Sequence, residues 1–387
     1  MSNPFKPTAG ATPPLLVGRQ PVLDAFQESI EDGPGSPYLL QLMTGARGVG
    51  KTVMLNELGE VAQANGWVVI HVTAGPGMLE RIAQRARVRR QELGAVDRGH
   101  GATTWSVTTP LGGVSRQSPS PEAESWPWVD EVAALLDVLA AHQTGVCITV
   151  DEIHSLDVEQ MQTLAGDIQM LIRESRPIAL IMAGLPRAVE ELLAGESRPT
   201  TFLRRAERPV LRDVPVSEVA DSFLQIVTDA GRSLSDELAM VCARATNGYP
   251  FMIQLVGYHT WRQGRTGPIT AEHVTAGVAA ARARLGALVH EPALADLSEV
   301  DRTFLVKMAQ DDGASRLADI AARMGKTSQY AGVYRDRLLK AGMIQAAGYG
   351  LVDFDAPYLR EYLREHAAHL MADRHTRHTR SDEGGPG

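Results

Sequence analysis

Residues 45–52 of this chain read Gly45-Ala46-Arg47-Gly48-Val49-Gly50-Lys51-Thr52. It follows an apolar run at 38–43 and precedes a segment at 53–58 whose apolar residues have helical spacing. A Gly-x4-Gly-Lys-Thr sequence between a strand and a helix is typical of a phosphate-binding loop, because backbone N–H groups and the positive end of the helix can surround phosphate oxygens. A glycine-rich turn without a ligand is the alternative. The context favours the binding of a nucleoside triphosphate, which we take to be ATP.

The residues of this loop have separate expected roles. We expect the whole loop and Val53 to contact the nucleotide, and Lys51 to reach its β- and γ-phosphates and to assist catalysis. The Thr52 hydroxyl should ligate Mg²⁺. ATP and Mg²⁺ are therefore the predicted cofactors.

An acidic pair follows the apolar run 146–150, which predicts a buried strand. Asp151 and Glu152 stand directly at the end of that strand. Together with a phosphate-binding loop, this pattern is a Walker B motif. We expect Asp151 to bind Mg²⁺ and Glu152 to take a proton from the attacking water. The alternative is that both carboxylates only cap a helix before Ser155. The two motifs together predict a slow, Mg²⁺-dependent ATPase.

The composition is that of a globular protein with more than one domain. The chain has 387 residues, of which 44% are hydrophobic and 22% are charged. A net charge of −8 argues against general coating of nucleic acid, although a local basic patch is compatible with it. Cys147 and Cys242 fit no metal-ligand spacing and are expected to be buried thiols. Without a secretory signal or a membrane-length apolar run, we expect a cytoplasmic protein with no membrane partner.

Hydrophobic periodicity divides the chain into regions. Residues 15–213 predict an α/β core, followed by an all-α lid at 214–292 and a winged helix-turn-helix at 293–368. Residues 94–126 predict an irregular insertion in the core, whereas residues 1–14 and 369–387 are expected to be disordered. Strands of the core are expected at 38–43, 66–72, 146–150, 178–183 and 209–211.

Two short motifs resemble those of known ATPases. Leu15-Leu16-Val17-Gly18-Arg19 resembles the adenine-contacting box of the AAA+ and STAND ATPases, with an ordinary helix entry as the alternative. Gly248-Tyr249-Pro250 resembles a lid motif of the STAND class, whose proline packs near the nucleotide. Origin-recognition-like AAA+ proteins are near relatives, but they place an arginine in the lid where residues 250–254 have none. The chain thus resembles the archaeal-ATPase-like, STAND-type AAA+ P-loop ATPases.

This resemblance implies a P-loop NTPase core with a parallel five-stranded sheet in the order 5-1-4-3-2. It also implies that Val17, Gly18, Arg19 and Pro250 contact the nucleotide. At the tip of the fourth strand, Gly184 stands where these families carry a side chain that senses the γ-phosphate.

Two arginines precede the expected fifth strand. Arg204 and Arg205 stand where the resembling families keep a catalytic arginine finger, which implies a role at the γ-phosphate of a neighbouring subunit. A solvated basic turn is the alternative for this pair.

The last region has the pattern of a winged helix. Helices are expected at 299–310, 316–324 and 328–341, followed by strands around 343–344 and 351–353. Double-stranded DNA is the expected partner, since basic residues outnumber acidic ones between 316 and 340. A protein-docking module is the alternative. The residues that we expect to contact DNA are Lys326, Gln329, Tyr330, Arg335 and Arg337.

The combined prediction is a regulatory switch that binds and hydrolyses ATP. Nucleotide would close the lid on the core, and this closure would reposition the winged helix on DNA. One alternative is an ATP-locked scaffold whose winged helix docks a protein. Another is an initiator or loader that assembles on DNA as a homo-oligomer.

Overall fold

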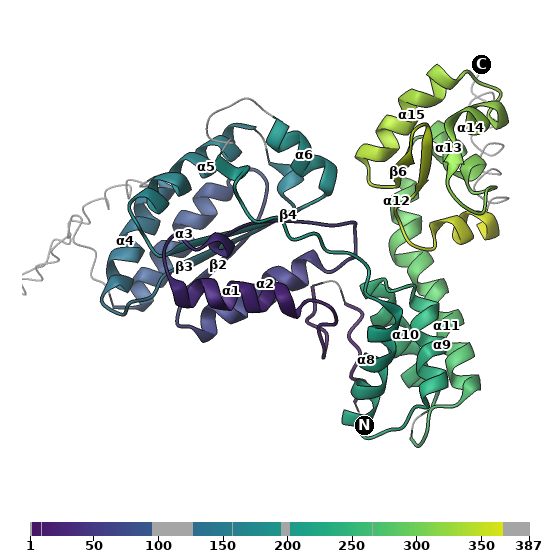
Figure 1. The fold of residues 1–387 in the computed structure, drawn as a ribbon, viewed down its shortest axis with the longest axis horizontal. Helices are drawn as coiled ribbons and strands as arrows, with labels where there is room; N and C mark the ends of the chain where they lie inside the picture. The colour runs from purple at the N-terminus through teal and green to yellow at the C-terminus, as the bar shows by residue number, and fades with distance from the viewer. Residues whose placement is uncertain are drawn as a thin grey trace, which may run out of the picture.

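The computed structural model describes residues 2–8, 10–94, 127–156, 158–194, 202–264 and 266–366. Figure 1 shows an α/β core, a bundle of helices below and to its right, and a C-terminal region above that bundle. Apart from Gly94, the expected insertion at 94–126 lies outside the described residues, as does the expected tail at 369–387. None of the helices in the described ranges is long and apolar enough to span a bilayer.

The described part of the core contains a parallel sheet of four strands in the order β1-β4-β3-β2. In register, Leu40 pairs with Leu180, and Val146 pairs with both Val68 and Ile178. The carboxyl ends of the strands therefore meet at one edge of the sheet. The strand interiors are almost continuously apolar because helices cover both faces. The strands are β1 (Leu40–Thr44), β2 (Val68–Thr73), β3 (Val146–Asp151) and β4 (Ile178–Gly184).

The expected strand at 209–211 is irregular. The chain here makes isolated parallel bridges to β1, Gln41 with Glu207 and Thr44 with Val210. Leu211 N donates to Thr44 O at 2.7 Å, whereas Pro209 has no N–H with which to continue a regular ladder. The implied five-stranded sheet is thus present as four strands and an irregular edge beside β1.

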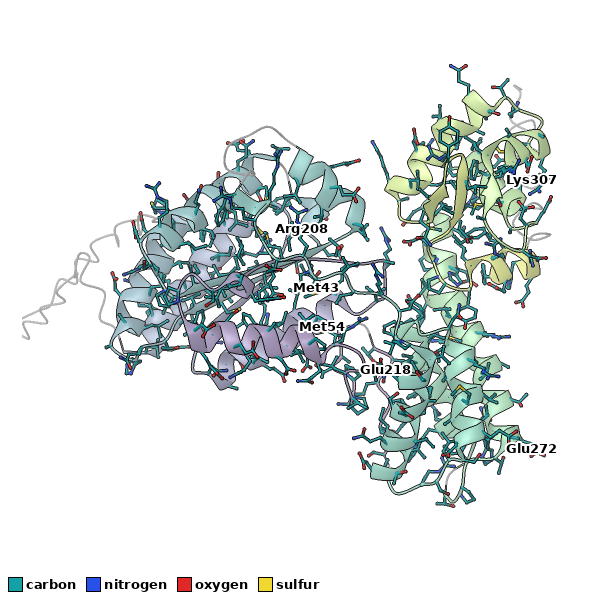
Figure 2. All side chains as sticks on the ribbon, viewed as in Figure 1. Met43, Met54, Arg208, Glu218, Glu272 and Lys307 are labelled. Carbon is teal, nitrogen blue, oxygen red and sulfur yellow. The ribbon has the colours of Figure 1, made fainter. Side chains whose placement is uncertain are left out.

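Helices pack on both faces of the sheet. On one face lie α1 (Gln20–Asp32) and α2 (Lys51–Ala64). Figure 2 labels Met43 of β1 and Met54 of α2, which are buried together in this layer. The predicted burial of Cys147 and Cys242 is confirmed, and burial raises the pKa of each thiol to about 12. The opposite face of the sheet carries α3 (Met78–Glu92), α4 (Trp128–Ala140), α5 (Val158–Arg173) and α6 (Pro186–Ala194).

The prediction of disorder at 1–14 is wrong for the described residues of that segment. Phe5 has only 2% of its surface exposed and packs against Phe223, with 5.6 Å between the ring centroids. Asn3 Nδ2 donates to Tyr258 O at 3.0 Å. The polar, proline-rich composition that suggested disorder includes one large apolar side chain, and its burial contributes about 1.5–3 kcal/mol to ordering the segment.

The lid is a bundle of helices with its own apolar core. Two of its helices are capped by hydroxyls: Ser235 accepts from Leu238 N, and Thr270 accepts from His273 N. The buried Arg232 guanidinium donates hydrogen bonds to the backbone carbonyls of Trp261, Gly264 and Gly267. These bonds hold the loop between the helices at 250–263 and 271–285. The helices are α8 (Val216–Asp229), α9 (Asp236–Thr246), α10 (Pro250–Gln263), α11 (Ala271–Leu285), a π-helical turn (Gly286–His290) and α12 (Glu291–Ala295).

The C-terminal domain combines helices with an antiparallel sheet of order β5-β7-β6. In its interior, Phe304, Leu338 and Val352 belong to one buried apolar cluster. Its elements in chain order are α13 (Glu299–Met308), β5 (Ser315–Arg316), α14 (Leu317–Arg323), α15 (Ser328–Lys340), β6 (Ile344–Gly348) and β7 (Leu351–Phe354).

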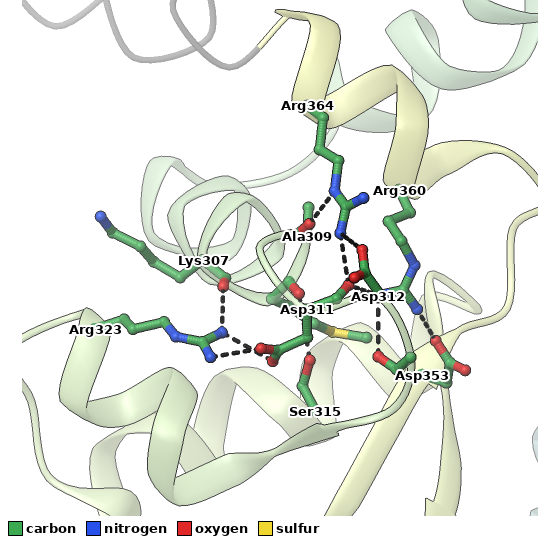
Figure 3. Close-up of polar contacts among 11 residues, drawn as sticks. Lys307, Ala309, Asp311, Asp312, Ser315, Arg323, Asp353, Arg360 and Arg364 are labelled. Atoms are coloured by element: carbon green, nitrogen blue, oxygen red, sulfur yellow. Dashed lines mark hydrogen bonds and ion pairs between the residues drawn. The ribbon is translucent and has the colours of Figure 1, made fainter.

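Arginines of the C-terminal domain hold the connection between α13 and β5 (Figure 3). Arg323 donates to both carboxylate oxygens of Asp311 and to Lys307 O. The Arg323 guanidinium lowers the pKa of Asp311. Arg364 donates to Ala309 O and Asp311 O. These guanidiniums satisfy carbonyls that end α13, so part of the positive charge in this domain has a structural role.

Candidate functional site

The loop 45–52 has the backbone of a phosphate-binding loop. Gly48 and Gly50 have φ angles of +76° and +94°, a region that favours glycine, and α2 begins directly after Gly50. At Gly45, a Cβ would lie 2.8 Å from Leu211 O, so only glycine fits beside the irregular edge segment. The loop therefore presents the first N–H groups of α2 toward the edge where the strands end.

The Lys51 side chain bends back over the loop. Its Nζ donates to Gly45 O at 2.9 Å and to Ala46 O at 2.8 Å. Burial lowers the pKa of this ammonium, and the carboxylates of Glu152 and Asp151 oppose that effect. The charged nitrogen is thus held at the mouth of the loop, where a phosphate group would contact it.

The predicted metal ligands are brought together. Thr52 Oγ1 donates to Asp151 Oδ2 at 2.5 Å, although Thr52 lies in the first turn of α2 and Asp151 ends β3. A hydroxyl and a carboxylate oxygen are ligands that suit Mg²⁺, which in nucleotide sites takes few protein ligands and completes its shell with phosphates and water. Among the described residues there is no group of three or more His, Cys, Asp or Glu that could hold a metal ion.

Glu152 adopts a strained backbone beside the metal ligands. Its φ of +58° is unusual for a non-glycine residue, and its N–H donates to Asp151 Oδ1 at 2.8 Å. The turn aims the segment after β3 along the sheet edge, where Ile153 packs on Gly184. A Cβ at Gly184 would lie 2.5 Å from Ile153 Cγ1, so close packing explains why the tip of β4 carries no side chain.

A cavity of about 850 Å³ is lined by Lys51, Thr52 and Glu152 of the core and by residues of the lid, whereas Asp151 is not among its lining residues. Among the described residues that line it, the positively charged side chains outnumber the negatively charged Glu152 and Asp296. This balance suits a polyphosphate. The positively charged lining residues are Lys6, Arg19, Arg47, Lys51 and Arg284.

Most of the predicted nucleotide contacts line this cavity. Gly45, Ala46 and Gly18 do not appear among its lining residues. At Gly18, φ is +68° and a Cβ would lie 3.2 Å from Glu218 Oε2. Those that line it are Val17, Arg19, Arg47, Gly48, Val49, Gly50, Lys51, Thr52, Val53, Glu152 and Pro250.

Arg19 braces the loop. Its Nη2 donates to Val49 O at 3.2 Å and to Arg212 O at 2.7 Å, and burial lowers the pKa of the guanidinium. The side chain thereby ties the phosphate-binding loop to the chain that leads into the lid. This bracing is a role that the motif alone did not indicate.

Tyr249 is a site residue that the sequence reasoning missed. A Cβ at Gly48 would lie 1.8 Å from Tyr249 Oη, so the hydroxyl lies against the loop backbone. Burial, together with the nearby carboxylates of Asp213 and Asp355, raises the pKa of Tyr249, which remains a neutral phenol. Its position beside Pro250, a predicted contact, was an available signal. No local motif marks Arg284, which reaches the cavity from α11.

The two arginines proposed as fingers do not line this cavity. Arg204 Nε donates to Leu193 O at 2.9 Å, and both Arg204 and Arg205 are exposed. A role in the site of a second subunit stays a prediction.

The residues predicted to contact DNA differ in their exposure and in their ion pairs. Lys326 and Gln329 are exposed, and Tyr330 is half-buried under the Lys326 ammonium. Arg335 pairs with Asp336, whereas Arg337 Nη2 pairs at 3.0 Å with Asp301, whose side chain is only 2% exposed. That carboxylate also caps α13 through Ser298.

Comparisons with known proteins agree with this architecture. Residues 15–181 match the family model of the AAA ATPase domain, and residues 287–363 match a domain of unknown function (DUF8462). Comparison with curated proteins gave no match.

Two solved structures share the fold over nearly their whole length. The Orc2 protein of Aeropyrum pernix, in ADPNP–ADP complexes, has a TM-score of 0.62 at 16% identity, over 95% of this chain and 97% of that one. The Walker-type ATPase PABY2304 of Pyrococcus abyssi has a TM-score of 0.64 at 12% identity, over 90% and 96%. Residues 15–181 thus match the model of an AAA ATPase domain, and the chain shares the α/β P-loop fold and the domain arrangement of these two solved structures.

Proposed function

We propose that this protein binds ATP with Mg²⁺ in the cavity and hydrolyses it. The observation that carries the proposal is the contact between Thr52 and Asp151, with Lys51 and Glu152 beside it, at the mouth of a cationic cavity. Thr52 and Asp151 would hold the metal, which would neutralise phosphate charge. Lys51 would bind the β- and γ-phosphates, and Glu152 would orient a water molecule and take its proton.

The proposal has a direct test in nucleotide binding. A fluorescent ATP analogue titrated in the presence of Mg²⁺ should bind the wild-type chain. The substitution Lys51→Ala should weaken that binding at least 10-fold, because it removes the buried cation at the phosphate position. Lys307→Ala, on the C-terminal domain, is the matched control and should bind as the wild type does. Equal affinity for all three proteins would refute the proposed site.

We infer further that the ATPase acts as a switch. The cavity is lined by the core and by the lid, so a nucleotide would contact both. The C-terminal domain also reaches this region: Tyr358 Oη donates to Ala245 O at 2.5 Å, and the Asp355 carboxylate interacts with Lys51. Filling the cavity would therefore change contacts of all three regions. Small-angle scattering with ATP, ADP and no nucleotide should give different curves, and identical curves would contradict a switch.

We propose double-stranded DNA as the partner of the C-terminal domain. The order helix, strand, helix, helix, strand, strand supports a winged helix, in which α15 would be the helix that enters the groove. The exposed residues Lys326 and Gln329 lie at the start of α15 and support this role. The Orc-like fold adds support from analogy only. The assignment to the STAND branch likewise stays a prediction.

Salt dependence separates DNA binding from its alternatives. Lys326→Ala should reduce the slope of log affinity against log salt by about 0.9, the effect of one phosphate contact. If the chain binds no duplex DNA in any nucleotide state, the C-terminal domain is instead a protein-docking module. A nucleotide-dependent increase in mass by light scattering would favour the oligomeric loader.

A further inference from the structure

Residues 3–8 and 10–13 form a segment, called here the strap, that contacts both the lid and the first two turns of α2. At its beginning, Asn3 Nδ2 donates to Tyr258 O at 3.0 Å, and Lys6 N donates at 3.0 Å to Gln254 Oε1. Both partners belong to α10. The strap is therefore attached to the same lid helix that begins at the predicted contact Pro250.

Phe5 anchors the strap in a fitted socket. The ring is 2% exposed and lies against Phe223 at 5.6 Å between centroids. Opposite, a Cβ at Gly257 would lie 2.2 Å from Phe5 Cδ1, so α10 can admit the ring only because residue 257 has no side chain. A glycine in the middle of a helix makes it less stable than an alanine would. Here the open space at Gly257 is filled by Phe5.

The other end of the strap lies on the core. Asn56 Nδ2 of α2 donates to Gly10 O at 3.3 Å. A Cβ at Gly10 would lie 3.9 Å from Thr52 Cγ2, which places the strap in van der Waals range of the predicted metal ligand. The strap thus bridges the lid and the phosphate-binding helix.

The strap also lines the cavity. Its lining residues are Lys6, Pro7, Thr8, Gly10, Ala11 and Pro13, and its contact residues Thr52 and Gln254 line the same cavity. Lys6 is exposed and is the charged residue among these six. Its ammonium adds a cation to a wall that otherwise consists of small and apolar groups.

We propose that the strap is a wall of the ATP site, in which Lys6 contacts the bound nucleotide and Phe5 positions Lys6. This inference rests on the proposed ATP-binding function and adds a binding determinant outside the phosphate-binding loop. The strap contacts both α10 and α2. A nucleotide that fills the cavity and contacts Lys6 therefore holds the strap against both helices. The strap contributes to binding of ATP and takes no part in the chemical step.

Hydrogen exchange separates this inference from the function on which it rests. The full chain is measured with Mg²⁺ and a non-hydrolysable ATP analogue, and without them. Peptides covering 2–14 and 45–52 should both exchange several-fold more slowly with nucleotide. Slower exchange at 45–52 alone would overturn the strap proposal and leave the ATP site intact. Unchanged exchange in both peptides would refute the ATP site itself.

Kinetics of substituted proteins test the residues. Lys6→Ala should raise KM for ATP about 10-fold and leave kcat within about twofold, the effect of losing one charge-assisted contact in binding alone. Lys6→Arg should restore most of the affinity, and Lys340→Ala, a matched exposed lysine on α15, should change neither constant. An unchanged KM in Lys6→Ala would overturn the contact.

The anchor is tested from both sides of the socket. Phe5→Ala empties it and Gly257→Val blocks it, and both should reproduce the KM effect of Lys6→Ala with little change in kcat. Phe5→Leu should recover part of the affinity because a smaller apolar group still enters the socket. If the Phe5→Ala protein melts as the wild type does and keeps its KM, the anchoring role is wrong. If Gly257→Val fails to fold, the Phe5 pair decides the question alone.

Discussion

The phenol oxygen of Tyr249 lies directly against the backbone of Gly48, so the start of lid helix α10 packs on the phosphate-binding loop. A Cβ at position 48 would come within 1.8 Å of that oxygen and 2.6 Å of Cζ. Tyr249 is buried and directly precedes α10, the helix that also carries the strap. The glycine is thus required twice, by its positive φ and by its neighbour from the lid.

This double requirement predicts different costs at two glycines of the loop. Gly50→Ala should lower stability by roughly 1 kcal/mol, because its φ of +94° is strained for alanine but a Cβ there meets nothing within 4 Å. Gly48→Ala should lower stability by at least about 1 kcal/mol more than Gly50→Ala, because Tyr249 must also move to make room for the Cβ. Chemical denaturation measures both. Adding Tyr249→Ala should remove the extra cost of Gly48→Ala, and equal costs at the two glycines would contradict the packing.

Stability should fall in mild acid because of His290. Burial lowers the pKa of this imidazole from 6.5 to about 4, and its Nε2 has no hydrogen-bond partner among the described residues. Between these values the unfolded chain binds a proton that the folded chain does not, so stability is lost as the pH falls from about 6.5 to about 4. The full effect is roughly 3 kcal/mol.

The control for this pH effect is His290→Phe, which keeps a ring next to Tyr362. Unfolding free energies at pH 7.5 and pH 4.5 should differ less in His290→Phe than in the wild type. The same pH dependence in both proteins would show that His290 does not titrate as described.

Two neighbouring arginines of α15 should differ in their effect on stability. Arg337→Ala leaves the buried Asp301 carboxylate without its cation and should lower the free energy of unfolding by about 1–2 kcal/mol. The loss is smaller than for a fully buried ion pair because Arg337 is itself more than half exposed. Arg335→Ala breaks a pair with an exposed Asp336 and should cost less than about 0.5 kcal/mol. Denaturation of the two proteins without DNA gives the comparison. A larger loss in Arg335→Ala would contradict the assigned pairing.

The arginine-finger hypothesis is testable through protein concentration. If Arg204 or Arg205 acts in a neighbouring subunit, specific ATPase activity should rise with protein concentration in the wild type, since a finger accelerates turnover by roughly 10³-fold or more. Arg204→Ala or Arg205→Ala should abolish this rise. A wild-type activity strictly proportional to enzyme concentration would remove the case for a finger in trans.

The residues of the site that can be predicted from the sequence are those in short, continuous motifs. The phosphate-binding loop and the Asp151–Glu152 pair were identified because each motif lies in one continuous stretch beside a strand. The meeting of Thr52 with Asp151 then follows from parallel strands, whose carboxyl ends share an edge.

Other features depend on pairs that are distant in sequence. Nothing local shows that Phe5 fits the space at Gly257, and a polar, proline-rich composition argued for disorder instead. Likewise the charge of Arg337 suggested a contact with DNA, yet its position relative to Asp301 gives it a structural partner. Tertiary packing determines both the order of the Phe5 segment and the partner of Arg337, and neither can be predicted from composition or local spacing.

Hydrolysis of ATP at this site is tested with Glu152→Gln, by measuring ATP affinity and steady-state turnover on the same protein. A carboxamide cannot take the proton of the attacking water, while Lys51, Thr52 and Asp151 remain in place. ATP affinity should stay within about twofold of the wild type, and turnover should fall about 100-fold or more. Turnover equal to that of the wild type would contradict the assignment of Glu152 and the proposed hydrolytic site.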